Sequence, residues 1–283
     1  MSKWNMIVDV AECTNCGLCS IACQDEFVGN TFPGYAAEMP RRGKNWIEIE
    51  QKVRGQAPMV DVAYLPKMCQ HCDDAPCIKA AKDGAISKRA DGIVLIDPVK
   101  SKGQQHLVDA CPYGAITWNE ESQVPQSWFF DAHLLDEGWK EPRGPQVCAT
   151  NALVAKKMSD EEMSKLVQQE GLEELHPDLR TKPRVWYKNL ARFQKSFIGG
   201  SVSQDKAGIV DCVEGASVTL LQSDAEIAQA DTDYFGDFRF EALEPGSGAY
   251  TIVINATGVA EKRIDVSLDD SYSPSVSLGE ICL

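Results

Sequence analysis

The 283-residue sequence lacks any long apolar stretch. Nowhere do about 18 apolar residues follow one another, as a membrane-spanning helix requires. The first residues, MSKWNMIVDVAEC, lack the basic region and apolar run of a secretory signal. Basic residues are also few, with 28 Lys and Arg against 42 Asp and Glu, and the net charge of −14 repels nucleic acids and anionic membranes. We therefore expect a cytoplasmic protein with no membrane segment and no nucleic-acid partner; export with a signal-bearing partner stays open.

Cysteine, in contrast, is abundant. The chain has eleven cysteines, of which nine precede residue 150, mostly at gaps of two to four residues. Such short gaps are typical of metal ligands and not of disulfides. In a reduced compartment thiols stay unpaired, so thiolates are available to bind metal.

The first cysteine group, CTNCGLCSIAC, has the C-x2-C-x2-C-x3-C spacing of bacterial ferredoxins, in which three thiolates hold one cubane and the fourth ligates another. Zinc usually takes its four ligands from two separated pairs, so this spacing favours an iron–sulfur cluster over zinc or buried thiols. We expect Gly17 to relieve backbone crowding in the loop. The group consists of Cys13, Cys16, Cys19 and Cys23.

The second group, CQHCDDAPC, supplies three thiolates and needs a fourth. The best candidate is Cys111 in DACPYGA, because a remote Cys-Pro step completes clusters in ferredoxins. With four thiolates available, we expect His71 to support the ligands or to lie on the surface. The predicted site is Cys69, Cys72, Cys77 and Cys111.

A short internal repeat relates three segments: CPYGAI from Cys111, CATNAL from Cys148 and AKDGAI from Ala81. Each has Gly or Asn at its fourth position, the residues that most easily adopt a left-handed turn. Cys148 therefore occupies the same last-ligand position as Cys111, and Ala81 marks a position from which a ligand is missing. Chance similarity of six-residue windows is the alternative.

Composition divides the chain into three parts: a cysteine-rich part at 1–155, a helical connector and arm at 156–204, and a strand-rich part at 205–283. Short strands are predicted at 45–53, 59–65 and 92–98. SDEEMSKLVQQEG predicts a helix with Ser159 as N-cap, Glu162 as its capping-box partner and Gly171 at the end. Its apolar stripe should pack on the first part.

The last part alternates apolar and polar residues in GASVTLL, DFRFEAL, AYTIVINA and KRIDVSL, with turns at EPGSG and DDSYSP. This period of two predicts a β-sandwich. Cys212 and Cys282 fall in strand-like segments, where we expect small buried side chains and no disulfide.

The order of these motifs, including HCDDAPC and CPYGA, resembles the iron–sulfur (beta) subunits that accompany molybdopterin enzymes of the dimethyl-sulfoxide-reductase family. The resemblance also involves DGIVLIDP, CPYGAITWNE, AHLLD and TKPRVWYKNL, and spans nearly the whole chain. It implies an α+β fold: a double ferredoxin-like iron–sulfur domain, a helical connector, and a C-terminal β-sandwich similar to transthyretin-like or carboxypeptidase-regulatory-like domains.

The resemblance also implies which thiols share a cluster. Family members have four cysteine motifs and four clusters, and the last cysteine of each motif joins the cluster of its partner motif. One 4Fe-4S cluster would then be held by Cys13, Cys16, Cys19 and Cys148, and another by Cys69, Cys72, Cys77 and Cys111. A third cluster position has lost its ligands, at Ala81, Ser101, Gln104 and Leu107.

At the fourth cluster position Trp128, Asp131 and Gly144 stand where cysteines belong, and only Cys23 remains. The carboxylate of Asp131 can bind iron but is a harder ligand than thiolate. Trp128 and Gly144 offer no side-chain ligand. We therefore expect two 4Fe-4S clusters. A further cluster at this fourth position would lack the ligands that it needs, which leaves Cys23 as a relic thiol.

The implied function is electron transfer by a non-catalytic subunit in a heterodimer. The partner would be a large catalytic subunit that alone holds molybdenum and molybdopterin guanine dinucleotide, since nothing in this sequence resembles a pterin site and no nucleophile and base are paired in it. The closest branch of the family acts on polyhydroxylated aromatics and is of the transhydroxylase type. Three alternatives remain: the electron-transfer subunit of a related aromatic-ring hydroxylase or reductase, a mainly structural subunit, and a free-standing electron carrier.

Overall fold

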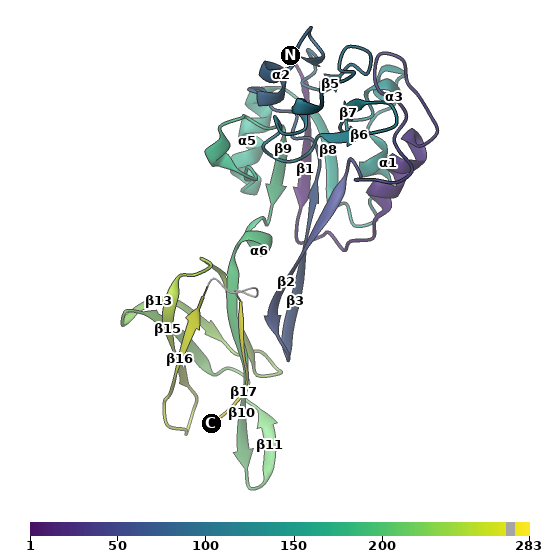
Figure 1. Ribbon diagram of the computed structural model, residues 1–283. Coiled ribbons are helices and arrows are strands. Elements are labelled where there is room, and N and C mark those ends of the chain that lie inside the picture. The colour runs from purple at the N-terminus through teal and green to yellow at the C-terminus, as the bar shows by residue number, and fades with distance from the viewer. Residues whose placement is uncertain (270–274) are drawn as a thin grey trace. The chain divides into compact units, whose positions relative to one another are not determined.

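The computed structural model describes residues 1–269 and 275–283, which form two compact units (Figure 1). Unit 1 comprises Met1–Glu50 and Tyr64–Leu190, and unit 2 comprises Gln51–Ala63 and Ala191–Leu283. The boundary after Leu190 falls within 156–204, the predicted connector. Apart from its first residue, the predicted turn DDSYSP lies outside the described residues. Among the residues described, no helix is both long and apolar enough to cross a membrane.

Unit 1 is built around a three-stranded sheet in which β1 (Lys3–Asp9) lies between β8 (Leu153–Met158) and β9 (Val185–Lys188). β1 pairs antiparallel with β8 and parallel with β9, so the sheet joins the first strand of unit 1 in the sequence to its last. Shorter elements carry the cysteine loops. They are α1 (Leu18–Phe27), α2 (Pro76–Ala80), β4 (Ile86–Lys88), β5 (Val94–Ile96), η1 (Gln105–Leu107), β6 (Thr117–Asn119), β7 (Val124–Gln126), α3 (Ala132–Asp136), α4 (Arg143–Gln146) and η2 (Pro177–Leu179).

The predicted helix after the cysteine-rich part is confirmed as α5 (Asp160–Glu170). The Ser159 side chain accepts from the Glu162 backbone N–H, the Glu162 carboxylate accepts from the Ser159 N–H, and Gly171 ends the helix in the left-handed conformation. Met163 and its apolar neighbours pack against Ile7 of the sheet. The apolar stripe is therefore used for packing, as expected.

A two-stranded ribbon of β2 (Glu48–Gln56) and β3 (Met59–Lys67) runs from unit 1 into unit 2. Its tip carries Arg54, which is only 1% exposed and pairs with Asp61. Asp61 also accepts from Arg192 (3.0 Å) and Arg239 (3.2 Å). Burial alone would raise the pKa of the Asp61 carboxyl, but Arg54 and Arg192 lower it well below its ordinary value. The ribbon tip is therefore an integral part of unit 2.

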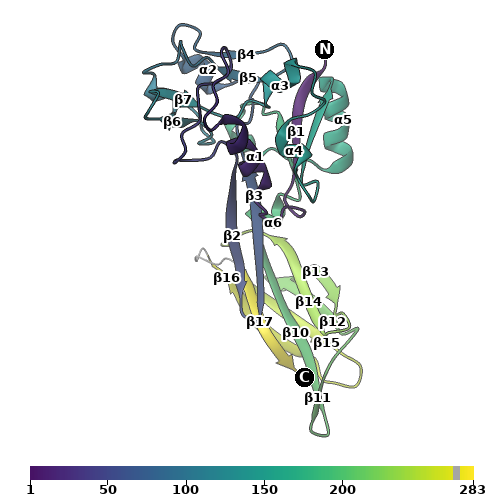
Figure 2. The ribbon, with the colours of Figure 1, turned by 90° about the vertical axis from the view of Figure 1, so that its right-hand side faces the viewer.

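Besides the ribbon tip and the short helix α6 (Ala191–Gln194), the described residues of unit 2 form two four-stranded sheets (Figure 2). The apolar residues of both sheets share one core, which confirms a β-sandwich and the alternation of the four segments. One sheet contains β10 (Ser196–Lys206), β11 (Ile209–Cys212), β14 (Asp237–Leu243) and β17 (Val276–Cys282). The other contains β12 (Ser217–Gln222), β13 (Ala225–Asp231), β15 (Gly248–Asn255) and β16 (Lys262–Leu268).

The expectation that Cys212 and Cys282 are buried is wrong, because both thiols are exposed. Both cysteines pair in register with Ser203, one on each side of β10. A whole strand therefore separates them, which is too far for a disulfide. Alternation within a strand could not reveal that these ends of β11 and β17 face solvent.

Candidate functional site

The second cysteine group and Cys111 surround one pocket in unit 1. Three of the thiols lie on the loop before α2 and on its first turn, and Cys111 comes from the segment after η1. The Ala115 N–H donates to the Cys111 sulfur (3.4 Å), a contact typical of sulfur ligands in iron–sulfur proteins. The cysteines that line the pocket are Cys69, Cys72, Cys77 and Cys111.

The electrostatics of this pocket favour a bound cation or cluster. Burial raises the pKa of the Cys69 thiol well above its usual range, and the neighbouring cysteines Cys111, Cys77 and Cys72 raise it further. The pKa of Cys77 rises to about 12 for the same two reasons, burial first. Four thiolates so close together repel one another unless positive charge lies between them. Metal binding here would therefore be coupled to proton release.

His71 is fully buried and lines the same pocket, so the surface alternative for this residue is wrong. The Val94 N–H donates to Nδ1 (3.1 Å), so the proton of the neutral ring is on Nε2, which has no hydrogen-bond partner among the described residues. Burial lowers the pKa of His71 well below its ordinary value, as do Lys88 and Arg184. Nδ1 lies 3.9 Å from the Cys69 sulfur.

Residues 181–184 hold the cysteine loop in place, although their sequence indicates only a packed arm. Arg184 donates through Nε to Asp73 (2.8 Å), and its backbone N–H donates to the Gln70 carbonyl (2.8 Å). Burial raises the pKa of the Cys72 thiol, whereas a hydrogen bond from the Thr181 hydroxyl lowers it. No spacing rule connects residue 72 with residue 181, so no local pattern indicates this contact.

The N-terminal group is brought together with Cys148. Burial raises the pKa of the Cys13 thiol, and the next causes that raise it are the charges of Cys148 and Cys16. The pKa of Cys19 rises to about 11, by burial first and then through Cys13 and Cys148. Charge coupling of this kind requires proximity. These charge effects indicate that Cys13 lies near Cys16 and Cys148, and Cys19 near Cys13 and Cys148. That the four thiols bind one cluster stays a prediction.

Gly17 is favoured by the backbone conformation of the loop. A Cβ added there would meet no protein atom within 4 Å, so the expected relief of crowding beside a cluster stays a prediction. Its φ of 73° lies in the left-handed region, and it is the residue before α1. Glycine is needed for the turn that directs Cys19 and Cys23 onto the helix.

The three repeated segments share a left-handed residue at the fourth position, and the two that begin with cysteine adopt the same turn. Gly84, Gly114 and Asn151, at the fourth position of each, have φ of 64°, 63° and 55°. The turn after Cys111 is closed by a bond from the Gly114 N–H to the Cys111 carbonyl (3.0 Å), and that after Cys148 by the equivalent bond from Asn151 (3.1 Å). The predicted left-handed turns are confirmed, and Cys148 and Cys111 have equivalent local geometry.

Cys23 lies on the inner side of α1 and is 4% exposed. Its pKa is raised well above the usual range by burial, then by Asp131 and Cys19. Asp131 is 2% exposed and both of its carboxylate oxygens accept hydrogen bonds, from Trp128 Nε1 (3.0 Å) and from the Arg143 N–H (2.9 Å). These bonds occupy the carboxylate as a cross-link within the protein.

We expect Asp131→Ala to destabilise unit 1 by about 2–5 kcal/mol, because it leaves two buried donors without an acceptor. The iron content should not change, since the cross-link occupies both oxygens. Chemical denaturation and iron analysis of the same preparation measure the two effects. Asp109→Ala removes an exposed carboxylate and should change stability by no more than about 0.5 kcal/mol. A loss of iron from Asp131→Ala alone would identify this carboxylate as a ligand.

The cluster position that has lost all its ligands, at Ala81, Ser101, Gln104 and Leu107, is filled by protein side chains. Gln104 accepts from the Lys82 N–H (3.0 Å) and donates to the Lys100 carbonyl (2.8 Å), so its amide ties together the segments beside Ala81. Leu107 is fully buried in an apolar cluster with Ile86, Val94, Ile96 and Ile116. This packing leaves the segment stable without a metal centre.

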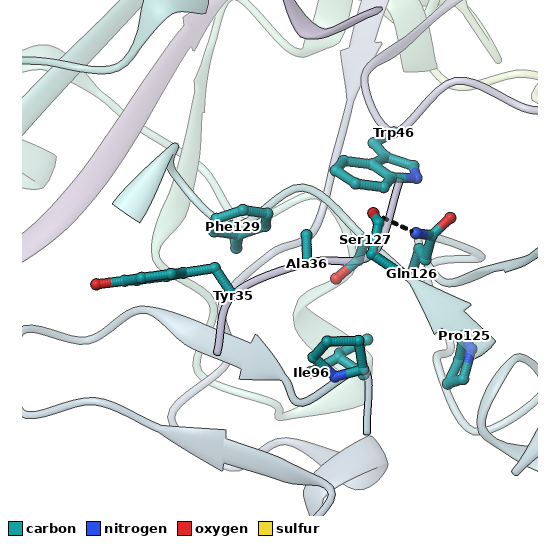
Figure 3. Close-up of a pocket in the computed structure, with 10 residues that line it drawn as sticks. Tyr35, Ala36, Trp46, Ile96, Pro125, Gln126, Ser127 and Phe129 are labelled. Carbon is teal, nitrogen blue, oxygen red and sulfur yellow. Dashed lines mark hydrogen bonds between the residues drawn. The ribbon is translucent and has the colours of Figure 1, made fainter. Parts of the chain in front are cut away.

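A small pocket next to the Cys69 site shares two of its lining residues, Ile96 and Ser127 (Figure 3). Trp46 and Phe129 line its other side, together with Tyr35. The indole N–H of Trp46 is buried without a hydrogen-bond partner among the described residues. No cysteine is among the residues that line this pocket.

The donor set of the second cysteine group fits an iron–sulfur cluster. In the described ranges 1–269 and 275–283, no three Cys, His, Asp or Glu side chains converge on one ion position. A cubane binds each thiolate through a different iron, so its ligands surround a cavity, as the four cysteines at residues 69–111 do.

Comparison with known proteins agrees with this chemistry. Residues 60–158 match the 4Fe-4S dicluster domain family. Over 289 aligned residues that cover both chains completely, the sequence is 45% identical to the pyrogallol hydroxytransferase small subunit of Pelobacter acidigallici. It is 32% identical to the arsenate respiratory reductase iron–sulfur subunit of Shewanella sp. strain ANA-3, covering 50% of this chain and 55% of the relative. It is 29% identical to the Hdr-like menaquinol oxidoreductase iron–sulfur subunit 1 of Archaeoglobus fulgidus, covering 66% and 84%.

The gathered thiols and the dicluster match define a 4Fe-4S iron–sulfur protein. The full-length similarity is more specific. The chain belongs to the iron–sulfur small subunits of the dimethyl-sulfoxide-reductase family, and it is an electron-transfer subunit homologous to the pyrogallol hydroxytransferase small subunit.

Proposed function

We propose that the chain carries electrons in a heterodimer with a large molybdopterin subunit that acts on polyhydroxylated aromatics. The full-length 45% identity to a pyrogallol hydroxytransferase small subunit is the observation that carries this proposal. Hydroxyl transfer on the ring belongs to the partner, which holds the molybdenum and the molybdopterin guanine dinucleotide. In finer detail, we propose that the fold is a double ferredoxin-like domain with a transthyretin-like sandwich.

The chain holds two 4Fe-4S clusters in this proposal. The proximity of four thiols in each group supports the ligand sets. When bound, a cluster accepts and releases single electrons, and its potential depends on burial and on hydrogen bonds to sulfur. This chain contributes the thiolates, the backbone donor at Ala115 and the Thr181 hydroxyl. The ligands are Cys13, Cys16, Cys19 and Cys148 for one cluster, and Cys69, Cys72, Cys77 and Cys111 for the other.

Metal analysis of the purified complex tests the proposal. We expect about eight irons and as many acid-labile sulfides on this chain, with molybdenum in the partner. EPR of the reduced complex should show two cluster signals. About twelve irons would mean that Cys23 helps to hold a third cluster. An active complex without molybdenum would contradict the choice of partner.

A further inference from the structure

The residues at the three lost ligand positions of the fourth motif, Trp128, Asp131 and Gly144, lie between the two thiol groups. They belong to one hydrogen-bonded segment of unit 1, which begins beside the Cys69 site and ends beside Cys19. The two ends of this segment can be followed contact by contact.

On the Cys69 side the contacts are between rings. His71 Nδ1 lies 3.9 Å from the Cys69 sulfur. The His71 ring lies 4.7 Å from the ring of Phe130 and 6.0 Å from that of Trp128, measured between centroids. Phe130 and Trp128 are stacked, with centroids 4.8 Å apart and planes at 27°. The rings of His71, Phe130 and Trp128 therefore form a continuous series of contacts that begins at the Cys69 sulfur.

On the Cys19 side the contacts are hydrogen bonds and packing. The Trp128 indole donates to one oxygen of Asp131 (3.0 Å), and the other oxygen accepts from the Arg143 backbone N–H (2.9 Å). The next residue is Gly144, where an added Cβ would lie 3.9 Å from the Cys19 Cβ. The peptide of α4 therefore reaches the second thiol group.

The residues along this path are buried, and two of them have a strained backbone. His71, Trp128, Phe130 and Asp131 are each at most 2% exposed. Phe130 and Asp131 are consecutive residues in the left-handed region, with φ of 58° and 48°. Residues other than glycine keep such a backbone only where the surroundings enforce it, most often at functional positions. The strain here directs a ring towards His71 and a carboxylate towards Arg143.

We propose that His71, Phe130, Trp128 and Asp131 form a bridge that couples the two cluster sites electronically. The bridge takes the place of the cluster whose ligands were lost at Trp128, Asp131 and Gly144. The inference rests on the two-cluster function proposed above. One cluster is oxidised by one electron, the other is reduced by the same electron, and no proton moves. The bridge residues stay in their neutral or resting state throughout. Their part is to fill the gap with contacting groups, since tunnelling through packed atoms is faster than across a void.

Rapid-freeze EPR on the holo complex tests the bridge. After a pulse of less than one electron equivalent of reductant, the redistribution between the two cluster signals gives the intercluster rate. We expect Phe130→Leu and Trp128→Leu to slow this step several-fold, and Phe130→Tyr to keep the wild-type rate. Phe129→Leu is the matched control, because Phe129 is also buried and its ring lies near those of Phe27, Tyr35 and Trp46, with no ring contact to His71 among the described residues. Figure 3 shows Phe129 with Tyr35 and Trp46.

The outcomes separate this inference from the proposed function. A wild-type chain with about four irons would refute the two-cluster function itself. Two intact clusters with equal rates in Phe130→Leu and Phe129→Leu would refute only the bridge. Should a leucine variant lose iron, Phe130→Met replaces it in the same measurement: a rate below that of Phe129→Leu supports the bridge, and an equal rate overturns it.

Discussion

Replacing Cys148 by Ala should remove one of the two clusters, whereas replacing Cys23 by Ala should leave both intact. The iron content of the Cys148→Ala chain is expected to fall from about eight to about four, or to about seven if a three-iron core survives. The reason is proximity: Cys148 is coupled to both Cys13 and Cys19, whereas Cys23 is coupled first to Asp131 and then to Cys19, on the inner side of α1.

Each variant serves as the control for the other, because each removes one thiol from the same half of unit 1. Iron analysis and the EPR spectrum of the reduced complex measure the effect. The signal of the Cys69 cluster should remain in both variants. Iron loss from Cys23→Ala together with full retention in Cys148→Ala would reverse the assignment of the last ligand.

The sequence predicted the candidate site well where its cysteines lie within a few residues of one another. Spacing alone grouped Cys69, Cys72 and Cys77, which line one pocket. The short repeat related Cys111 to Cys148, and their matching left-handed turns confirm the shared local geometry, whereas a shared ligand role stays a prediction. The sandwich strands followed from alternation, because one face of each strand packs in a common core. Local patterns encode these features, so they can be predicted without knowledge of the fold.

Features that depend on distant partners could not be predicted. His71 is buried because Val94, Phe130 and Trp128 surround it, and none of them is near it in sequence. The ribbon tip joins unit 2 through Arg54, whose partners come from other strands and from the residue after α6. Such contacts arise from tertiary packing, and the periodicity of the sequence does not predict them.

Removing both clusters should unfold unit 1 and leave the sandwich of unit 2 folded. A structural metal centre contributes on the order of 10 kcal/mol to folding, by comparison with zinc sites, and a domain is stable by only about 5–15 kcal/mol. The cysteine loops of unit 1 have few strands to hold them, and their thiols lose the charge that bound them together. Unit 2, in contrast, has an apolar core shared by both sheets and contains no cluster ligand.

Hydrogen exchange measured by mass spectrometry after chelation of the iron tests this expectation. Amides around Cys69, Cys111 and Cys148 should lose protection, while those of β12, β14 and β15 keep it. A double variant, Cys212→Ser with Cys282→Ser, should behave like wild type, because these exposed thiols lie outside both groups. If unit 1 kept full protection without iron, the clusters would serve electron transfer alone, and the packing around Leu107 and Asp131 would be sufficient to hold the fold.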